Sequence, residues 1–397
     1  MNKYFYSKLS VLLLIIFQLS WGSIKLSNEA EISILTCKPG TELYSSFGHN
    51  AIRINDPIIR IDKVFNYGIF DFNTPNFYSK FVLGELKYRL AVSDYFRYKQ
   101  EYIFDDRTMI EQSLNLPQNV KQSLFDLLNI NYLPENRYYL YNFFYDNCST
   151  RLRNIIEKAT AGQLITPNDN ALGNLSFRNS LKPFLQDRQW LNFGMDLILG
   201  LPSDKIMSNR EFTFLPDELY KSYENTTWYN TDEDLIDKTE IIYQSSRQSD
   251  YVEYIFSPTV ILWVVFLLIG VVLWFNHTTE NAIMELILLA LSSLFGLIFL
   301  FLWFFTNHKS MAINLNILWA IPTHLPVVIL YKWLSDKFKV YYFLVTGLLM
   351  ILVLIGWKFI PQEFSVATIP IILMLIVSSF SIYYKIRNRL FVNKELS

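Results

Sequence analysis

The chain of 397 residues is 51% hydrophobic and only 18% charged, whereas about a quarter of the residues in a soluble domain are charged, so the composition favours a membrane protein. Lys and Arg number 35 against 36 Asp and Glu, and this net charge of −1 offers no positive excess for binding nucleic acid. Two cysteines in all exclude a disulfide-stapled small domain and a multi-cysteine zinc or iron–sulfur module.

The N-terminus is typical of a secretory signal peptide. Two lysines precede an apolar run over 9–19, and small residues at Ser20 and Gly22 take the positions that signal peptidase reads. The run is too short for a comfortable transmembrane helix. We therefore predict a signal peptide over residues 1–22, with an uncleaved anchor as the alternative.

An exported α+β domain is predicted to follow at residues 23–231. Runs rich in Ile, Val, Phe and Tyr indicate strands at 31–36, 51–54, 58–62 and 64–72. Apolar residues at helical spacing predict one helix over 119–129, and a cap at Asp146 predicts a second over 146–160. The domain is long enough to bury a core of its own.

The stretch from 161 to 250 contains four prolines and is predicted to be loop-rich. We expect its polar, acidic end at 232–253 to be a connector that leads to the membrane. From 24 to 253 the chain carries 24 Lys and Arg against 31 Asp and Glu, a net charge of −7.

Five uncharged runs from residue 254 onward predict an all-α bundle of five transmembrane helices over 254–384, because each run is near the length that spans a bilayer. The runs are 254–279, 286–308, 310–331, 340–357 and 364–384. If five helices alternate, Lys309 and Lys358 lie on one side and seven basic residues on the other: Lys332, Lys337, Lys339, Lys385, Arg387, Arg389 and Lys394.

The positive-inside rule places these seven residues, and a basic tail at 385–397, in the cytoplasm. The exported domain then lies in the periplasm, as the export signal independently requires. The sequence therefore predicts a multi-pass protein of the inner membrane whose catalytic domain is periplasmic.

Cys148 and His49 are the candidate catalytic pair. His49 is the one histidine of four in the exported part, and Cys148 falls in the first turn of the helix capped by Asp146. The helix dipole lowers the pKa of a thiol at such a position, and we expect Arg151 and Arg153 to lower it further. A thiolate beside an imidazole is what thiol acyl transfer requires, since the His takes a proton and returns it to a leaving group.

Two other interpretations of the cysteines remain open. Free Cys is among the most buried residue types, and a strand His is often structural, so both are also compatible with ordinary core roles. A disulfide between Cys37 and Cys148 in an oxidising periplasm would exclude a thiol mechanism. We favour Cys37 as a small strand residue, because it lies in an apolar run before Pro39 and Gly40, away from any helix start.

Three separated motif blocks resemble the Lnb family, exported-domain membrane proteins of Bacteroidota that are associated with lipoprotein N-acylation. The blocks are LTCKPGTELYSSFGHNAIRI at 35–54, FNYGIFDF at 65–72 and YNFFYDNCSTRLRN at 141–154. The pattern of several C-terminal helices is similar too. More remotely, a His-bearing strand before an Asn-Cys helix, with Tyr141 seven residues ahead of Cys148, resembles the circularly permuted papain-like arrangement of the lecithin-retinol acyltransferase family.

The resemblance implies a two-step transfer through a thioester. Cys148 attacks an ester of a membrane phospholipid, and the N-terminal amine of a diacylated lipoprotein then takes the acyl chain. His49 would act as base and then as acid, oriented by a third polar group, for which we choose Asn66 over Asp71. The Tyr141 hydroxyl and a backbone N–H at Cys148 are the candidate oxyanion donors, the alternative for Tyr141 being ordinary packing.

The outer end of the membrane part supplies candidates for substrate binding. On the alternation above, His308 emerges on the side of the exported domain, with Asn314 and Asn316 within a turn of the next span. Such a polar cluster, together with Arg151, suits a lipid phosphate or the backbone of the acceptor. The alternative is that polar groups in spans only bond neighbouring helices.

No other chemistry is indicated by the sequence. It contains no His-Glu-x-x-His, no Gly-rich phosphate loop and no Gly-x-Ser-x-Gly. We expect no cofactor and no metal, a centre built from His49, His308 and Cys148 being a remote exception. His324, flanked by two prolines, is interpreted as structural. Two alternatives to the acyltransferase stay open: a cysteine hydrolase of lipid esters or cell-wall amides, and a non-enzymatic membrane sensor or adaptor.

Overall fold

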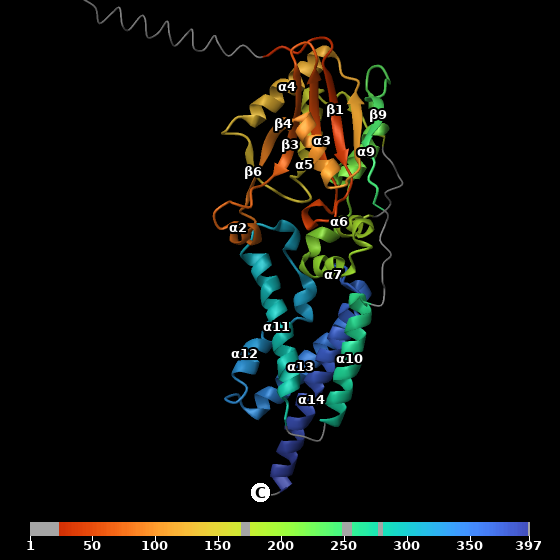
Figure 1. Ribbon diagram of the computed structural model, residues 1–397. Coiled ribbons are helices and arrows are strands. Elements are labelled where there is room, and N and C mark those ends of the chain that lie inside the picture. Colours follow the sequence, from red (N-terminus) through yellow and green to blue (C-terminus); the bar gives the residue numbers. More distant parts are fainter. Residues whose placement is uncertain (1–23, 168–174, 248–255, 277–280, 396–397) are drawn as a thin grey trace, which may run out of the picture.

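The computed structural model describes residues 24–167, 175–247, 256–276 and 281–395 (Figure 1). The predicted signal peptide, residues 1–22, lies outside the described residues. Figure 1 shows a domain of sheet and helices at one end, long helices at the other, and short helices between the two. An α+β domain followed by a helical membrane part, as the sequence predicts, is confirmed.

A seven-stranded antiparallel sheet forms the centre of the domain, in the order β6-β4-β3-β2-β1-β5-β9. The strand predicted separately at 58–62 is wrong, because the chain turns over 57–60 between β2 and β3. The seven strands are β1 (Glu31–Cys37), β2 (His49–Asp56), β3 (Ile61–Ile69), β4 (Lys87–Asp94), β5 (Met109–Leu114), β6 (Tyr138–Leu140) and β9 (Ile236–Tyr243).

β9 lies within the segment that the sequence assigns to an acidic connector at 232–253. It pairs with β5 from the Ile236–Leu114 pair to the Tyr243–Met109 pair. β9 is an edge strand, and most of its side chains stay in solvent. Charged residues are common on edge strands, where they discourage pairing with other chains. The polar composition of residues 236–243 is therefore that of an edge strand.

Helices cover both faces of the sheet, because successive side chains of a strand point to opposite faces. Ile34 and Ile52 belong to the core that includes residues of α4 (Gln118–Tyr132) and α5 (Cys148–Ala159). Leu35 and Ala51 face the other way, towards Tyr98 and Tyr102 of α3 (Tyr95–Phe104). A further short helix, α2 (Phe77–Leu83), lies between β3 and β4.

Short helices fill much of the region predicted to be loop-rich. Pro216 stands in the first turn of its helix, where the missing N–H costs nothing, so proline here starts a helix instead of marking a loop. Residues of this region pack around Phe144 and Phe214 in a second core. The helices are α6 (Phe177–Leu181), α7 (Gln189–Ile198), α8 (Asn209–Phe212) and α9 (Pro216–Glu224), and a strand pair joins β7 (Leu164–Ile165) to β8 (Thr227–Trp228).

Among the described residues, four helices are long and apolar enough to cross a membrane, where the sequence predicts five. They are α10 (Pro258–Phe275), α11 (Ile283–Phe304), α13 (Asp336–Ile355) and α14 (Thr368–Glu395). The predicted helix over 310–331 is wrong. This segment contains only two 3₁₀ turns and α12 (His324–Ile329), which begins two residues after Pro322 and carries Pro326 in its first turn, where proline is tolerated.

The irregular segment nevertheless connects opposite ends of the helices. At its start, the Asn307 N–H donates to the Leu83 carbonyl of α2, at 2.8 Å, beside the domain. At its end, Asp336 opens α13 and pairs with Lys339 and with Arg389, which belongs to the C-terminal part of α14, each at 2.8 Å. Figure 1 shows the C-terminal end of α14 at the end of the molecule away from the domain. The chain thus returns through the bundle, and these two basic residues lie toward the end away from the domain.

Candidate active site

Cys148 is the first residue of α5. Asn147 caps the helix in a capping box: its side chain accepts from the Thr150 N–H at 2.9 Å, and its own N–H donates to Thr150 Oγ1 at 2.7 Å. The cap is therefore Asn147, and the prediction of Asp146 as the cap is wrong. The helix starts at Cys148, two residues later than the predicted start at 146. The first backbone N–H groups of a helix have no partner within the helix, so the N–H at Cys148 can donate to a group bound beside the thiol.

A buried polar chain fixes this turn against the sheet. Ser149 Oγ donates to Asn50 Oδ1 at 2.7 Å, and Asn50 Nδ2 donates to Thr36 Oγ1 at 2.8 Å. All three side chains are buried. Because buried polar groups are costly to leave unpaired, the chain specifies one placement of α5 on β2 and β1. The residue beside Asn50 is His49, so the same contact positions the thiol and the imidazole.

His49 of β2 and Asn66 of β3 lie just beyond the point where the pairing of these two strands ends. The pairing of β2 with β3 runs from Asp56 and Ile61 to Ile52 and Phe65, so both residues lie beyond its last pair. His49 Nε2 is 2.5 Å from Asn66 Oδ1. An amide oxygen only accepts, so Nε2 carries a hydrogen and the other ring nitrogen, Nδ1, is left for Cys148. Asp71, the other residue considered for this position, is exposed and bonds to its own turn at the Asn73 N–H.

The Cys148 thiol and the His49 imidazole each stabilise the charged form of the other. Burial raises the pKa of Cys148, but the charge of His49, a hydrogen bond with it and the Asn50 N–H together lower that pKa to about 7. Burial lowers the pKa of His49, but the charge of Cys148 and hydrogen bonds with Cys148 and Asn66 raise it overall. The site therefore favours a thiolate–imidazolium pair near neutral pH.

The two arginines that follow Cys148 have other partners. Arg151 contacts Asp146 at 2.6 and 2.8 Å, and its guanidinium lies 3.4 Å from the centroid of the Tyr139 ring. Arg153 donates to Thr213 Oγ1 at 2.8 Å. The contribution to the thiol that the sequence assigns to these arginines comes instead from His49. Arg151 as a substrate contact stays a prediction, with its charge already paired.

Tyr141 and Gly68 complete the wall around the thiol. The Tyr141 ring stacks on Tyr88 with centroids 4.4 Å apart, and burial raises the pKa of its hydroxyl well above the ordinary value. Gly68 has a φ of +90° at a register shift between β3 and β4. A Cβ on Gly68 would lie 3.6 Å from the Tyr141 ring, 3.7 Å from Cys148 Cβ and 3.8 Å from His49 Cε1. Gly68 is not among the site residues predicted from the sequence, although a lone glycine in a strand run indicates a bulge or a close approach.

Substituting Gly68 by alanine should slow alkylation of the Cys148 thiol by iodoacetamide by about tenfold or more, because the methyl group fills the space between thiol, imidazole and phenol. Gly162→Ala is the matched control: Gly162 has a φ of +72° and nothing within 4 Å of an added Cβ. Both variants carry similar backbone strain, of about 1 kcal/mol. Rates of Cys148 alkylation, measured in a Cys37→Ala background beside thermal unfolding, separate loss of space at the thiol from loss of stability. Equal rates for the two variants would contradict the placement of Gly68 in the site.

The two cysteines are both free. Cys37 is the last residue of β1 and belongs to the core facing α3, with its Sγ 3.7 Å from the Tyr98 hydroxyl. Burial raises the pKa of Cys37 to about 12, so its thiol stays protonated. The assignment of Cys37 to a strand is confirmed, and Cys148 is not consumed in a disulfide.

Three residues of the membrane part are predicted to bind substrate, and they lie where this part contacts α2 and α7. We call this contact region the joint. Asn314 and Asn316 are buried, and both donate to the Leu197 carbonyl at the end of α7, at 2.7 and 3.1 Å. His308 is only partly buried, and its Nε2 donates to the Phe81 carbonyl of α2 at 2.9 Å. Contact of these three side chains with substrate stays a prediction, and the structure gives each an internal partner.

At the joint, the backbone of residues 200–201 also lies in direct contact with the backbone of residues 310–313. The Gly200 N–H donates to the Ser310 carbonyl at 2.9 Å, and the Leu201 N–H to the Ile313 carbonyl at 3.2 Å. A Cβ on Gly200 would come within 1.9 Å of the Ala312 carbonyl oxygen, so only glycine fits there. His324, deeper in the same segment, bonds through Nδ1 to the Tyr342 hydroxyl at 2.9 Å, as a structural role requires.

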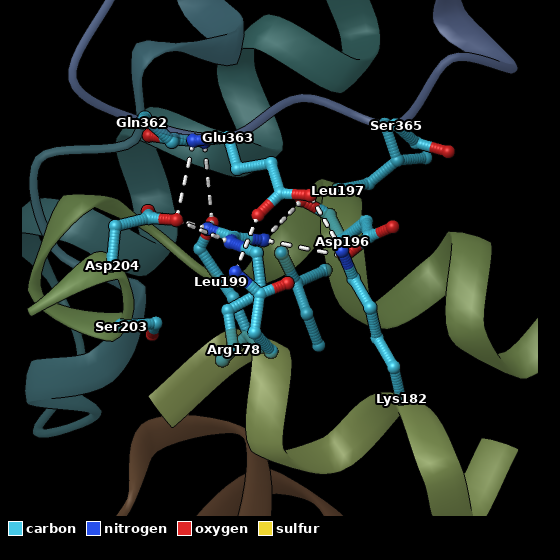
Figure 2. A network of polar contacts seen from close by, with 12 residues as sticks. Arg178, Lys182, Asp196, Leu197, Leu199, Ser203, Asp204, Gln362, Glu363 and Ser365 are labelled. Carbon is cyan, nitrogen blue, oxygen red and sulfur yellow. Dashed lines mark hydrogen bonds and ion pairs between the residues drawn. The ribbon is translucent and has the colours of Figure 1, made fainter. Parts of the chain in front are cut away.

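An ion-pair network that the sequence analysis missed holds the other side of the joint (Figure 2). Arg178 of α6 is buried and donates to both oxygens of Asp204, at 2.8 and 3.0 Å. Asp204 also accepts from the backbone N–H of Glu363, at 3.2 Å, and the Glu363 side chain accepts from Asn179 at 2.8 Å and from Lys182. Glu363 lies in the link between α13 and α14. The network therefore joins the short helices to the membrane part.

Across the described residues, no group of three or more His, Cys, Asp and Glu side chains is placed to hold a metal ion. The remote alternative of a centre from His49, His308 and Cys148 is not assembled, since His308 bonds to α2 while His49 bonds to Asn66. The chemistry available at the site is that of the thiolate, the imidazole and nearby hydrogen-bond donors.

Two protein-family models match the chain, one after the other. The model of the Lnb N-terminal periplasmic domain matches residues 19–177, which include His49, Asn66 and Cys148. The model of the Lnb transmembrane domain matches residues 249–389, which span the four long helices and the irregular segment. No curated protein and no solved structure matches the chain.

Proposed function

Since the chain belongs to the Lnb family, we propose that it is a membrane-bound thiol acyltransferase, which moves a fatty acyl chain from a phospholipid to the N-terminal amine of a diacylated lipoprotein. The observation that carries the proposal is Cys148 at the start of α5 with its pKa lowered to about 7 by His49, which Asn66 orients. A sensor or adaptor has no need of such a thiol.

The first step transfers the acyl chain to the enzyme. The Cys148 thiolate attacks the carbonyl carbon of a phospholipid ester, a C–S bond forms and the C–O bond to glycerol breaks. The His49 imidazolium gives its proton to the departing glycerol oxygen, which leaves a lysophospholipid and an acyl thioester. The backbone N–H at Cys148 and the Tyr141 hydroxyl would stabilise the negative charge on the carbonyl oxygen.

The second step transfers the chain to the acceptor. The N-terminal amine of the lipoprotein attacks the thioester carbonyl, an amide bond forms and the C–S bond breaks. His49 takes the proton that the amine loses, so the thiolate–imidazolium pair is restored. Asn66 keeps the ring in one orientation through both steps. Water is the rival acceptor, and if it reached the thioester the product would be a free fatty acid.

The placement of the domain supports a lipid substrate. Hydrogen bonds from α2, from the short helices and from the segments beyond α11 and α13 connect the domain directly to the membrane part, which would keep the site close to a lipid donor. We further propose that the membrane is the inner membrane, with the domain in the periplasm, and that the fold is a permuted papain-like one in which the strand of His49 precedes the helix of Cys148.

The test supplies the purified protein in lipid nanodiscs with a phospholipid carrying a labelled acyl chain and with a diacylated lipopeptide. We expect label on Cys148 that hydroxylamine removes, followed by label on the peptide amine. Release of label only as free fatty acid would favour the hydrolase of lipid esters. Absence of any label on Cys148 and on the peptide would contradict the proposal and favour the sensor or adaptor.

A further inference from the structure

Six aromatic side chains form a continuous row of ring contacts that starts at the active site. Tyr141 stacks on Tyr88 at 4.4 Å, and Tyr88 contacts Phe70 at 5.3 Å between ring centroids. Phe70 contacts Phe72 at 5.0 Å, and the row continues at 4.9 and 6.3 Å through Phe77 to Phe81. We call these six residues the aromatic track. Four of them belong to the excursion between β3 and β4 that contains α2.

The two ends of the aromatic track lie at the thiol and at the membrane. Tyr141 borders the space at Gly68 that also touches Cys148. At the other end, the Phe81 ring lies 6.5 Å from the His308 ring, and the carbonyls of Phe81 and Leu83 accept from His308 and Asn307. These two residues follow the last turn of α11, over which Figure 1 places α2. The track therefore links the outer end of a membrane span to the active site.

The excursion exposes apolar side chains at this level. Phe72 is 61% exposed, Tyr78 79% and Phe81 49%, and Phe304 and Phe305 at the end of α11 are 64% and 70% exposed. α2 carries one charged residue, Lys80. Aromatic side chains gather where a span leaves the hydrocarbon, because their rings favour the interface between lipid and water. The exposed side of α2 is thus continuous with the lipid-facing surface of α11.

We propose that the aromatic track carries the acyl chain of the donor phospholipid, drawn partly out of the outer leaflet so that its ester carbonyl reaches Cys148. This inference rests on the proposed function and adds the path of the substrate. An acyl chain that left the bilayer would expose methylene groups to water, which is unfavourable in proportion to their area. Rings along the path cover that area, and they bind chains of different lengths because contact with a ring face needs no fixed partner.

The first experiment reports binding without catalysis. The full-length Cys148→Ala protein in nanodiscs receives a phosphatidylethanolamine whose acyl chain carries a diazirine, and the cross-linked peptides are identified by mass spectrometry. We expect cross-links within residues 70–88 in addition to those on the spans. Cross-links on the spans alone would overturn the proposal, whatever the protein catalyses.

The second experiment uses the double variant Phe72→Gln, Phe81→Gln in the active protein. Acylation of Cys148 from long-chain phospholipid should fall by about tenfold or more, with a much smaller loss for a short-chain soluble ester that does not need the track. The matched control is Phe96→Gln, Tyr229→Gln, which removes two rings 73% and 67% exposed that are outside the aromatic track and should leave both rates unchanged.

The outcomes of the second experiment separate the two proposals. Equal losses with the long and the short ester, or no loss with either, would overturn the aromatic track while the thiol acyltransferase stands. A wild-type protein that forms no thioester from any phospholipid would overturn the proposed function, and with it the track as the path of a donor lipid.

Discussion

Replacing Cys148 by alanine is expected to abolish acyl transfer, with a loss of about 10⁴-fold or to below detection, because no other group among the described residues of the site can carry the acyl chain. The side chain is small and 5% exposed, so its removal should destabilise the protein by only about 1 kcal/mol. The measurement is the label on protein and on lipopeptide in the nanodisc assay. Far-ultraviolet circular dichroism confirms that the variant is folded.

Cys37→Ala is the matched control for Cys148→Ala. It removes the other thiol of the chain, which is equally buried and lies in the adjacent core between β1 and α3. We expect near wild-type transfer, with a destabilisation of about 1 kcal/mol from the small cavity. A Cys148→Ala protein that transfers acyl chains as fast as Cys37→Ala does would remove the thiol from the mechanism.

The thiolate of Cys148 should form as pH rises through about 7, and His49 should be the cause. Below this pH the thiol is protonated and unreactive, and above it alkylation by iodoacetamide reaches a plateau. In His49→Ala the largest lowering influence is lost while burial remains, so the midpoint should move above the ordinary value of 9.0. At pH 7 the thiolate fraction then falls by about fiftyfold.

The experiment uses the Cys37→Ala background, so that the alkylation rate against pH reports Cys148 alone. Arg151→Gln serves as the matched control, since it removes a nearby charge that is already paired with Asp146. Its midpoint should stay within a few tenths of a pH unit of the parent's. If His49→Ala keeps its midpoint near 7 and Arg151→Gln does not, the electrostatic roles assigned here are reversed.

The three strands in the middle of the sheet, β1, β2 and β3, were predicted from the sequence, and the strands on either side of them were not. β1 is buried over nearly its whole length and β2 contains the buried residues Ala51, Ile52 and Ile54, so apolar and β-branched residues indicate both strands directly. β9 has the sequence IDKTEIIY and leaves most of its side chains in solvent, so only its pairing with β5 makes it a strand. Edge strands gain their stability from a partner distant in the chain, which local pattern does not reveal.

The candidate site followed from residue chemistry, and its surroundings did not. A lone exported His and a Cys at a helix start are rare enough to be singled out, and Asn66 follows from strand adjacency. Arg178 gave no such signal, since its partner Asp204 and the residue linked through it, Glu363, come from separate segments of the chain. Its role depends on a tertiary arrangement that no single stretch of sequence encodes.

Residues 310–331 show that an apolar run of sufficient length does not by itself predict a transmembrane helix. Residues 310–331 are apolar enough to suggest a helix, but they contain two prolines and two buried asparagines whose amides satisfy carbonyls of α7. Irregular backbone is tolerated at this depth only where protein covers it. The prolines and asparagines within this apolar run were the one indication of irregular backbone. The predicted helix rested on the length and hydropathy of the run instead.

The backbone contact at Gly200 constrains how the short helices lie on the membrane part. Because the Gly200 and Leu201 N–H groups bond to the segment that follows α11, and no side chain fits between Gly200 and Ala312, the two parts cannot slide past each other at this point without breaking these bonds. Under the proposed function, the thiol would therefore keep a fixed distance from the lipid surface. Donor and acceptor lipids would have to cover that distance themselves.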